Sequence, residues 1–166
     1  MELVDTNTHL DLEQFSDDLD EVIAASRDAG VTRWINVGFD PDRWASTLAL
    51  VERIDGLLAM LGIHPGSVDH WSTDTFEKLA SLAREQQPVA IGEIGIDLYW
   101  QQDNLATQTE AFRAQLDLAR ELGVPAVIHM READDAMLET LESHGALPHI
   151  HFHSFDGGAG MRTWAL

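Results

Sequence analysis

The hydrophobic pattern of the chain alternates between two kinds of segment. Short runs rich in Val, Ile and Leu are each followed by a longer, charge-bearing amphipathic segment that ends near Gly or Pro, a pattern typical of strands alternating with helices. The predicted strands lie near residues 2–8, 31–38, 57–64, 88–96, 125–130 and 148–154. Repeats of this kind predict right-handed βαβ units and a parallel sheet, within a single α/β domain over residues 1–166.

Three of the intervening segments have clear helical features. Apolar residues recur at spacings of three and four over residues 106–122, and Gly123 ends this helix. Residues 17–29 form a second amphipathic helix. A third begins near Asp74, where Glu77 stands three residues later and completes a capping-box pattern.

Polar residues at the predicted strand ends distinguish between two α/β architectures. The alternation alone fits both an open doubly wound sheet and a (β/α)8 barrel. An imidazole or a carboxylate lies at or just past the end of the first, third, fourth, fifth and sixth strands: His9, His64, Glu93, His129 and His153. A barrel brings all its strand ends into one ring, whereas an open sheet gathers only neighbouring ends. We therefore expect a TIM-type (β/α)8 barrel, of which about six βα units are present.

The residue types at these strand ends indicate a metal site. The chain has no cysteine, so a metal must be held by imidazole and carboxylate groups, which suit a divalent ion such as zinc, manganese or iron. A carboxylate can bridge two such ions, which would clamp a phosphate ester and lower the pKa of a bound water. A single histidine on a strand is more often a hydrogen-bonded core or surface residue than a ligand. The hypothesis of a metal site therefore depends on the shared location of these residues at the strand ends.

The charge of the chain argues against a general nucleic-acid surface. A formal net charge of -19, with 29 acidic residues against 10 basic ones, repels DNA and anionic membranes at low salt. A few well-placed cations or metal ions can still reverse the field inside an active site. The absence of cysteine, of a basic leader with an apolar stretch and of a membrane-length apolar run favours a cytoplasmic location away from membranes. No stable protein partner is expected.

Five segments carry a resemblance to a known family. VDTNTHLD, LGIHPG, VAIGEIGIDLYW, VIHMREA and HFHSFDGG resemble, in order and approximate spacing, the signature stretches of the TatD family of metal-dependent hydrolases. The resemblance implies a TIM-type barrel with one or two divalent ions (Mg, Mn or Zn). It also implies hydrolysis of phosphodiester bonds in DNA, with 3′-exonuclease action as the expected activity.

The resemblance also implies roles for individual residues. His9 corresponds to the second histidine of an HxH pair, and Glu93 to the carboxylate shared by two metals. His129 and His153 correspond to ligands of the second metal. His64 resembles a catalytic or phosphate-binding residue more than a metal ligand.

Two further residues near these ligands are candidates for the site. Arg131 follows His129 by two residues, on the same face if the strand continues, and is a candidate phosphate contact. Asp97 either shapes the site or caps its loop.

The chain departs from the family pattern at two places. Asn7 stands where the first histidine of the HxH pair is expected, and its amide oxygen is a weaker metal ligand than imidazole. In addition, a closed barrel needs eight strands and about 250 residues, and an aspartate in a late segment resembling ETDAP is absent. We therefore expect a barrel that is incomplete at its C-terminus, with GAGMRTWAL as the start of a sixth helix.

Two alternatives to a deoxyribonuclease remain open. The same metal site could hydrolyse a small ester, a lactone or a cyclic amide, because one fold hosts many reactions and the acidic surface favours a small substrate. A catalytically inactive, truncated barrel that binds only metal or a partner is the other alternative.

Overall fold

Strands and helices alternate along the chain as the hydrophobic pattern predicts. A computed structural model describes residues 2–100 and 102–166. The strands are β1 (Leu3–Thr8), β2 (Val31–Gly38), β3 (Leu57–Leu61), β4 (Ala90–Asp97), β5 (Ala126–Arg131) and β6 (Ile150–Phe152). The helices are α1 (Leu19–Asp28), α2 (Trp44–Arg53), α3 (Thr73–Gln86), α4 (Leu105–Leu122), α5 (Asp134–Ser143) and α6 (Ala159–Ala165).

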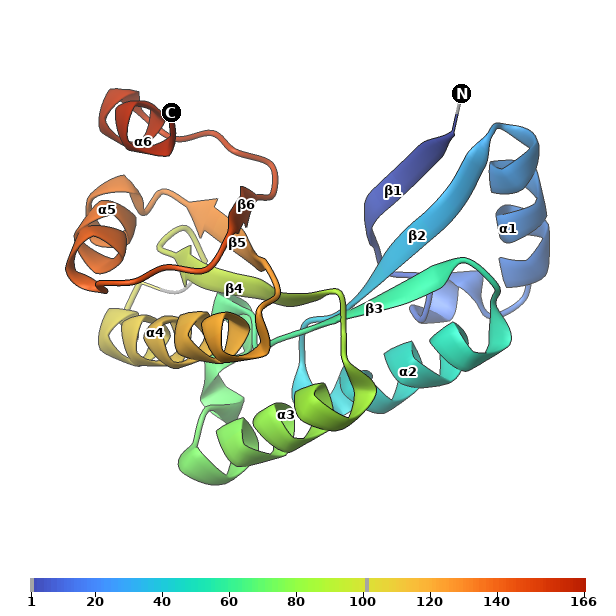
Figure 1. Cartoon of the computed structure of the whole chain (residues 1–166), viewed down its shortest axis with the longest axis horizontal. Coiled ribbons are helices and arrows are strands. Elements are labelled where there is room, and N and C mark those ends of the chain that lie inside the picture. Colours follow the sequence, from blue (N-terminus) through green and yellow to red (C-terminus); the bar gives the residue numbers. More distant parts are fainter. Residues whose placement is uncertain (1, 101) are drawn as a thin grey trace.

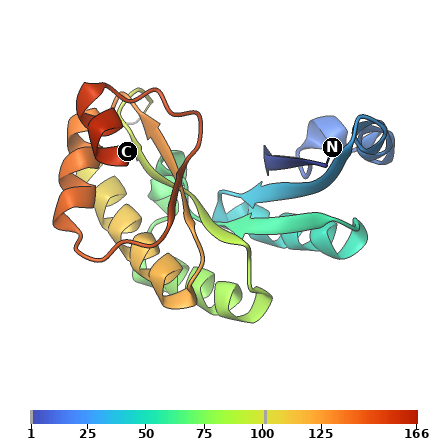
Figure 2. The ribbon, with the colours of Figure 1, turned by 45° about the horizontal axis from the view of Figure 1, so that its top comes forward.

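The order of the strands identifies the fold as barrel-like. The sheet has the order β1-β2-β3-β4-β5-β6, and every neighbouring pair is parallel. In a doubly wound sheet, the order in which successive strands are added reverses at an internal strand. Here each new strand is added at the same edge. The sheet curls, with helices α1 to α5 around its outer side, and β1 and β6 face each other across an open side (Figures 1 and 2). The described residues therefore form an open, barrel-like α/β sheet of six strands, which confirms the predicted fold class.

Several elements begin or end at other residues than the pattern predicts. Strand β3 ends at Leu61, and a short 3-10 helix begins at Pro65; between them the amide of His64 donates to the carbonyl of Phe39 at 2.9 Å. Helix α3 is capped by Ser72, whose hydroxyl accepts a hydrogen bond from the amide of Thr75 at 3.1 Å. The predicted capping box at Asp74 is therefore wrong by two positions. Among the helices of the described residues, none combines the length and apolar character needed to cross a bilayer.

Strand β4 lies at the centre of the core. All eight of its residues are buried, as expected for a parallel strand covered on both faces. On its outer side lies the apolar face of α4, where Phe112, Leu116 and Ala119 are fully buried. The pairing of β4 with β5 shifts between Gly92 and Ile94, so Glu93 is an extra residue in β4. Such irregularities redirect a side chain near a functional site.

Gly95 allows β4 to approach β5 closely beside this irregularity. Its φ is +143°, and a Cβ atom at this position would lie only 2.0 Å from the carbonyl oxygen of His129. Neither the backbone angle nor the space accepts a side chain. The glycine therefore fixes the distance between the two strands that carry Glu93 and His129.

We expect Gly95→Ala to lower the free energy of unfolding by about 3 kcal/mol or more, from backbone strain and overpacking together. Gly123→Ala is the matched control, because Gly123 also has a positive φ, +70°, but has nothing within 4 Å of its added Cβ. This control should cost only about 1 kcal/mol. Urea denaturation measures both, and equal losses would contradict the close approach of β4 and β5.

A candidate metal centre at the strand ends

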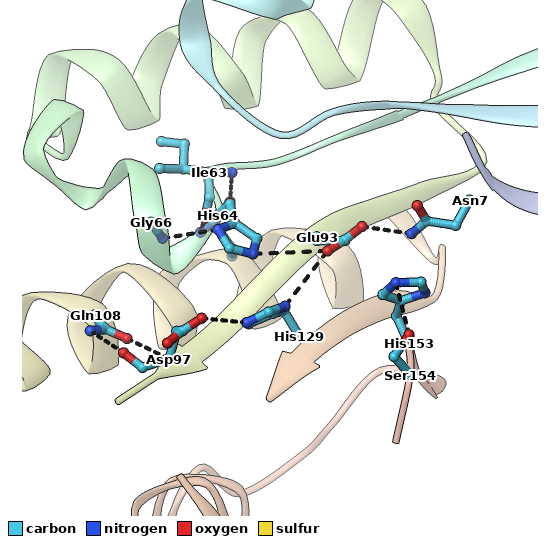
Figure 3. Close-up of polar contacts among 11 residues, drawn as sticks. Asn7, Ile63, His64, Gly66, Glu93, Asp97, Gln108, His129, His153 and Ser154 are labelled. Atoms are coloured by element: carbon cyan, nitrogen blue, oxygen red, sulfur yellow. Dashed lines mark hydrogen bonds and ion pairs between the residues drawn. The ribbon is translucent and has the colours of Figure 1, made fainter. Parts of the chain in front are cut away.

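The predicted site residues line one pocket at the carboxyl ends of the strands. This pocket has a volume of about 460 Å³, and its lining includes His9, His64, Glu93, His129, Arg131 and His153. Asn7 joins them through Glu93, to which its side-chain amide donates a hydrogen bond of 2.6 Å (Figure 3). The strand ends thus bring together all the residues that the sequence pattern singled out.

Three of these side chains form the closest group of potential ligands. One ligand atom from each of His64, Glu93 and His129 lies within 4.8 Å of the other two. The Oε2 atom of Glu93 is 3.9 Å from Nε2 of His64 and 3.8 Å from Nδ1 of His129. The carboxylate has only 8% of its side chain exposed. Nitrogen and oxygen donors around one buried carboxylate suit a divalent ion.

Asp97 determines how His129 faces this group. The Asp97 side chain is 2% exposed, and its Oδ2 lies 2.9 Å from Nε2 of His129. A carboxylate at this distance holds the ring proton on Nε2, so the lone pair of Nδ1 is directed towards Glu93. The other oxygen, Oδ1, accepts a hydrogen bond of 2.8 Å from the amide of Trp100. Asp97 therefore both orients His129 in the pocket and caps its own loop, the two roles that the sequence left open.

His64 has the opposite arrangement of its ring nitrogens. Its Nδ1 accepts a hydrogen bond of 2.9 Å from the amide of Gly66, so the proton of the neutral ring is on Nε2, which faces Glu93. Burial and, to a smaller extent, the neighbouring His129 lower the pKa of His64 to about 4, although Glu93 opposes both. At neutral pH the ring is therefore uncharged and presents an N–H donor to the pocket.

His9 and His153 lie further from the central group. Nδ1 of His9 is buried without a hydrogen-bond partner in the described part of the chain, and its ring packs edge-on against Phe39. His153 follows β6, and its Nε2 lies 3.2 Å from the hydroxyl of Ser154. A buried imidazole nitrogen without a partner costs free energy unless something binds it. Together with the central donors, it fits a divalent metal ion in this pocket.

Two buried glutamines on α4 hold the strand ends in place, and sequence reasoning gave neither a structural role. Gln115 accepts a hydrogen bond from the amide of Ile63 at 2.7 Å and donates to its carbonyl at 3.1 Å. Gln108 pairs in the same way with the amide of Asp97, at 2.8 Å, and its carbonyl, at 3.1 Å. The two glutamines are about two helical turns apart, so both face the sheet. Their spacing on the apolar face of a helix was the signal that could have identified them.

Asn36 and Asp11 fix the segment that carries His9, and the sequence pattern missed them as well. The side-chain oxygen of Asn36 accepts a hydrogen bond of 2.7 Å from the amide of Leu10, and its nitrogen donates to Asp11 at 3.0 Å. Arg43 lies 2.8 Å from the other oxygen of Asp11. Burial raises the pKa of this carboxyl, but its hydrogen bonds and Arg43 together lower it more, so the pKa lies below its ordinary value. The ionised Asp11 is thus a fixed anchor beside the pocket.

Comparisons with known proteins agree with the resemblance seen in the sequence. A family model described as "TatD related DNase" matches residues 4–166. The chain is 34% identical over 144 residues to the uncharacterized metal-dependent hydrolase YabD of Bacillus subtilis, covering 87% of this chain and 56% of that protein. It is also 34% identical over 156 residues to the 3′-5′ ssDNA/RNA exonuclease TatD of Cronobacter sakazakii, covering 93% of this chain and 59% of that protein.

A solved structure shows the same arrangement of elements. The crystal structure of YjjV, a TatD homologue from Escherichia coli, matches with a TM-score of 0.86 and 31% identity, covering 94% of this chain and 61% of that one. The chain therefore spans about three fifths of the length of the relatives that it matches.

We expect Gln115→Leu to lower the free energy of unfolding by roughly 2–4 kcal/mol, because it leaves the buried amide and carbonyl of Ile63 without partners. Gln86→Leu, at the exposed end of α3, is the control and should change it by less than about 0.5 kcal/mol. Chemical denaturation followed by tryptophan fluorescence measures both. A Gln115→Leu variant as stable as the control would show that this glutamine does not hold the strand end.

Proposed function

This chain belongs to the TatD family of metal-dependent hydrolases, and we propose that it cleaves phosphodiester bonds in DNA as a 3′-exonuclease. The observation that carries the proposal is the buried carboxylate of Glu93 between His64 and His129, with Asp97 behind His129. This arrangement combines metal ligands with a neutral hydrogen-bond donor in one pocket. The printed activity of the Cronobacter sakazakii relative supports a nucleic-acid substrate.

One or two divalent ions (Mg, Mn or Zn) would be held by Glu93 and His129, with His9 and His153 as further ligands. Asn7 would contribute its amide oxygen. A bound ion supplies a Lewis acid for a phosphate oxygen and lowers the pKa of a coordinated water. The anionic Glu93 balances the charge of the ion, and Asp97 keeps Nδ1 of His129 free to act as a ligand.

The remaining pocket residues would bind and orient the phosphodiester. His64 presents an uncharged Nε2–H, which can donate to a phosphate oxygen without repelling a nearby metal ion. Arg131 offers a planar guanidinium that pairs with phosphate in a bidentate manner. Because both groups are held by contacts outside the substrate, at Gly66 and Tyr99 respectively, little reorganisation is needed when the substrate binds.

A small ester, lactone or cyclic amide is the second candidate substrate, and the charge of the chain favours it. A net charge of -19 repels a polyanion, and Asp156 adds a further acid to the pocket lining. Release of 3′-terminal nucleotides from 5′-labelled DNA, compared with hydrolysis of small esters in the same Mn²⁺ buffer, distinguishes the two. Ester hydrolysis without nucleotide release would contradict the nuclease proposal.

We expect Glu93→Gln to abolish both retained metal and nucleotide release, because a neutral amide cannot balance the charge of the ions or bridge them. Metal content per folded chain, measured by elemental analysis after Mn²⁺ loading and desalting, tests the first effect. His149→Ala is the control, since His149 is exposed and lies outside the pocket lining. Stoichiometric metal in Glu93→Gln would disprove the assigned site.

We expect Asp97→Asn to weaken Mn²⁺ binding by about 10- to 100-fold without unfolding the chain, because the ring proton of His129 is no longer held on Nε2. Calorimetric titration measures the affinity, and Asp28→Asn on the exposed surface of α1 is the matched control. Equal affinities in the two variants would show that Asp97 acts only on its loop.

A further inference from the structure

Two large aromatic side chains stand exposed in the loop that follows β4. Tyr99 is 42% exposed and Trp100 is 69% exposed. The exposed Leu3 and Val4 lie on β1, at an edge of the sheet, whereas β4 has a neighbour on each side. The open edges of the sheet therefore account for Leu3 and Val4 but not for the aromatic pair. Exposed apolar surface of this kind indicates a binding site.

The aromatic pair is fixed in position relative to the pocket. The amide of Trp100 donates to Asp97, the same carboxylate that holds His129. The two rings pack edge to face, with centroids 4.5 Å apart and an interplanar angle of 89°. The planes of the two rings are therefore perpendicular. Their loop is hydrogen-bonded to Asp97, which also contacts His129 of the candidate metal centre.

Arg131 connects this pair to the pocket. Its guanidinium carbon lies 3.9 Å from the centroid of the Tyr99 ring and 5.6 Å from that of Trp100, and the same side chain lines the pocket. Stacking on a ring face leaves the N–H edge of a guanidinium available. Within the described residues, no carboxylate or other hydrogen-bond acceptor pairs with the guanidinium of Arg131, although the chain carries 29 acidic residues. Its charge is therefore available for an anion at the pocket rim.

We propose that Trp100, Tyr99 and Arg131 form a nucleotide subsite beside the metal centre. An unpaired base stacks on the exposed ring of Trp100, while Arg131, positioned by Tyr99, contacts the phosphate that leads into the pocket. The proposal rests on the proposed nuclease function. The subsite takes only unpaired bases, because bases in a duplex are already stacked on their neighbours. Every base has an aromatic face, so the subsite accepts all four bases.

Equilibrium binding separates the base contact from the phosphate contact. The probe is a fluorescent thymidine octamer, compared with an abasic octamer that has the same number of phosphates. Anisotropy is measured at low salt in EDTA, where no metal-dependent cleavage occurs. The wild-type chain should bind the thymidine octamer more tightly than the abasic one, and Trp100→Ala should weaken only the former, by about tenfold.

Three further variants serve as controls. Trp100→Phe keeps an aromatic face and should bind within about threefold of the wild type, which excludes a folding defect as the cause of the loss. Arg131→Ala should weaken binding of both octamers, and Leu3→Ala, at the β1 edge, should weaken neither. Nucleotide release by the same preparations is measured separately, so a chain that binds bases through Trp100 but cleaves no DNA would contradict only the nuclease function.

Two results would overturn the subsite. The first is equal affinity of the wild-type chain for the thymidine and abasic octamers. The second is unchanged thymidine binding by Trp100→Ala together with reduced self-association in sedimentation, which would show that Trp100 covers a contact between copies of this chain.

Discussion

Glu93 carries a negative charge into a strand that is buried along its whole length. Leaving such a charge without partners in the core would cost many kcal/mol, so the surrounding structure must compensate for it. Asn7 supplies a hydrogen bond of 2.6 Å from β1, and imidazoles approach from the ends of β3 and β5. Because these partners come from strands on both sides of β4, the curl of the sheet is needed to assemble them. The fold and the candidate metal centre therefore depend on the same buried carboxylate.

Neutral amide side chains hold the frame around this charge. Gln108 and Gln115 each pair with both the N–H and the C=O of one residue, as a neighbouring strand would. Asn36 supplies similar support behind His9. A charged group in these positions would compete with a metal ion for Glu93 or would itself need a buried counter-ion. The amide side chains complete the backbone hydrogen bonds at the strand ends and add no charge to the pocket.

The sequence predicts the parts of this structure that depend on periodicity and chain order. Alternating apolar runs locate β1 to β6, and polar residues at their ends identify His9, His64, Glu93, His129 and His153 as neighbours, which the pocket lining agrees with. The sequence cannot predict contacts that depend on side-chain direction between distant elements. Gln115 and Ile63 are 52 residues apart, and Asn7 and Glu93 are 86 apart. The tautomer of His129 depends in the same way on Asp97, 32 residues away. The tautomer of His64 depends instead on a local hydrogen bond from the amide of Gly66, two residues on.

The acidic surface restricts how such a site can bind a nucleic acid. With a net charge of -19, long-range attraction cannot supply the affinity that basic proteins gain from releasing counterions. Under the proposed function, the binding free energy must come from short-range contacts with a metal ion in the pocket, the guanidinium of Arg131 and the face of an aromatic ring. Stacking is little affected by the sign of the surrounding charge, and it acts on an unpaired base but not on a base within a duplex. If the proposed function holds, this acidic chain is therefore suited to a strand end that reaches the pocket, and poorly suited to holding an intact duplex along its surface.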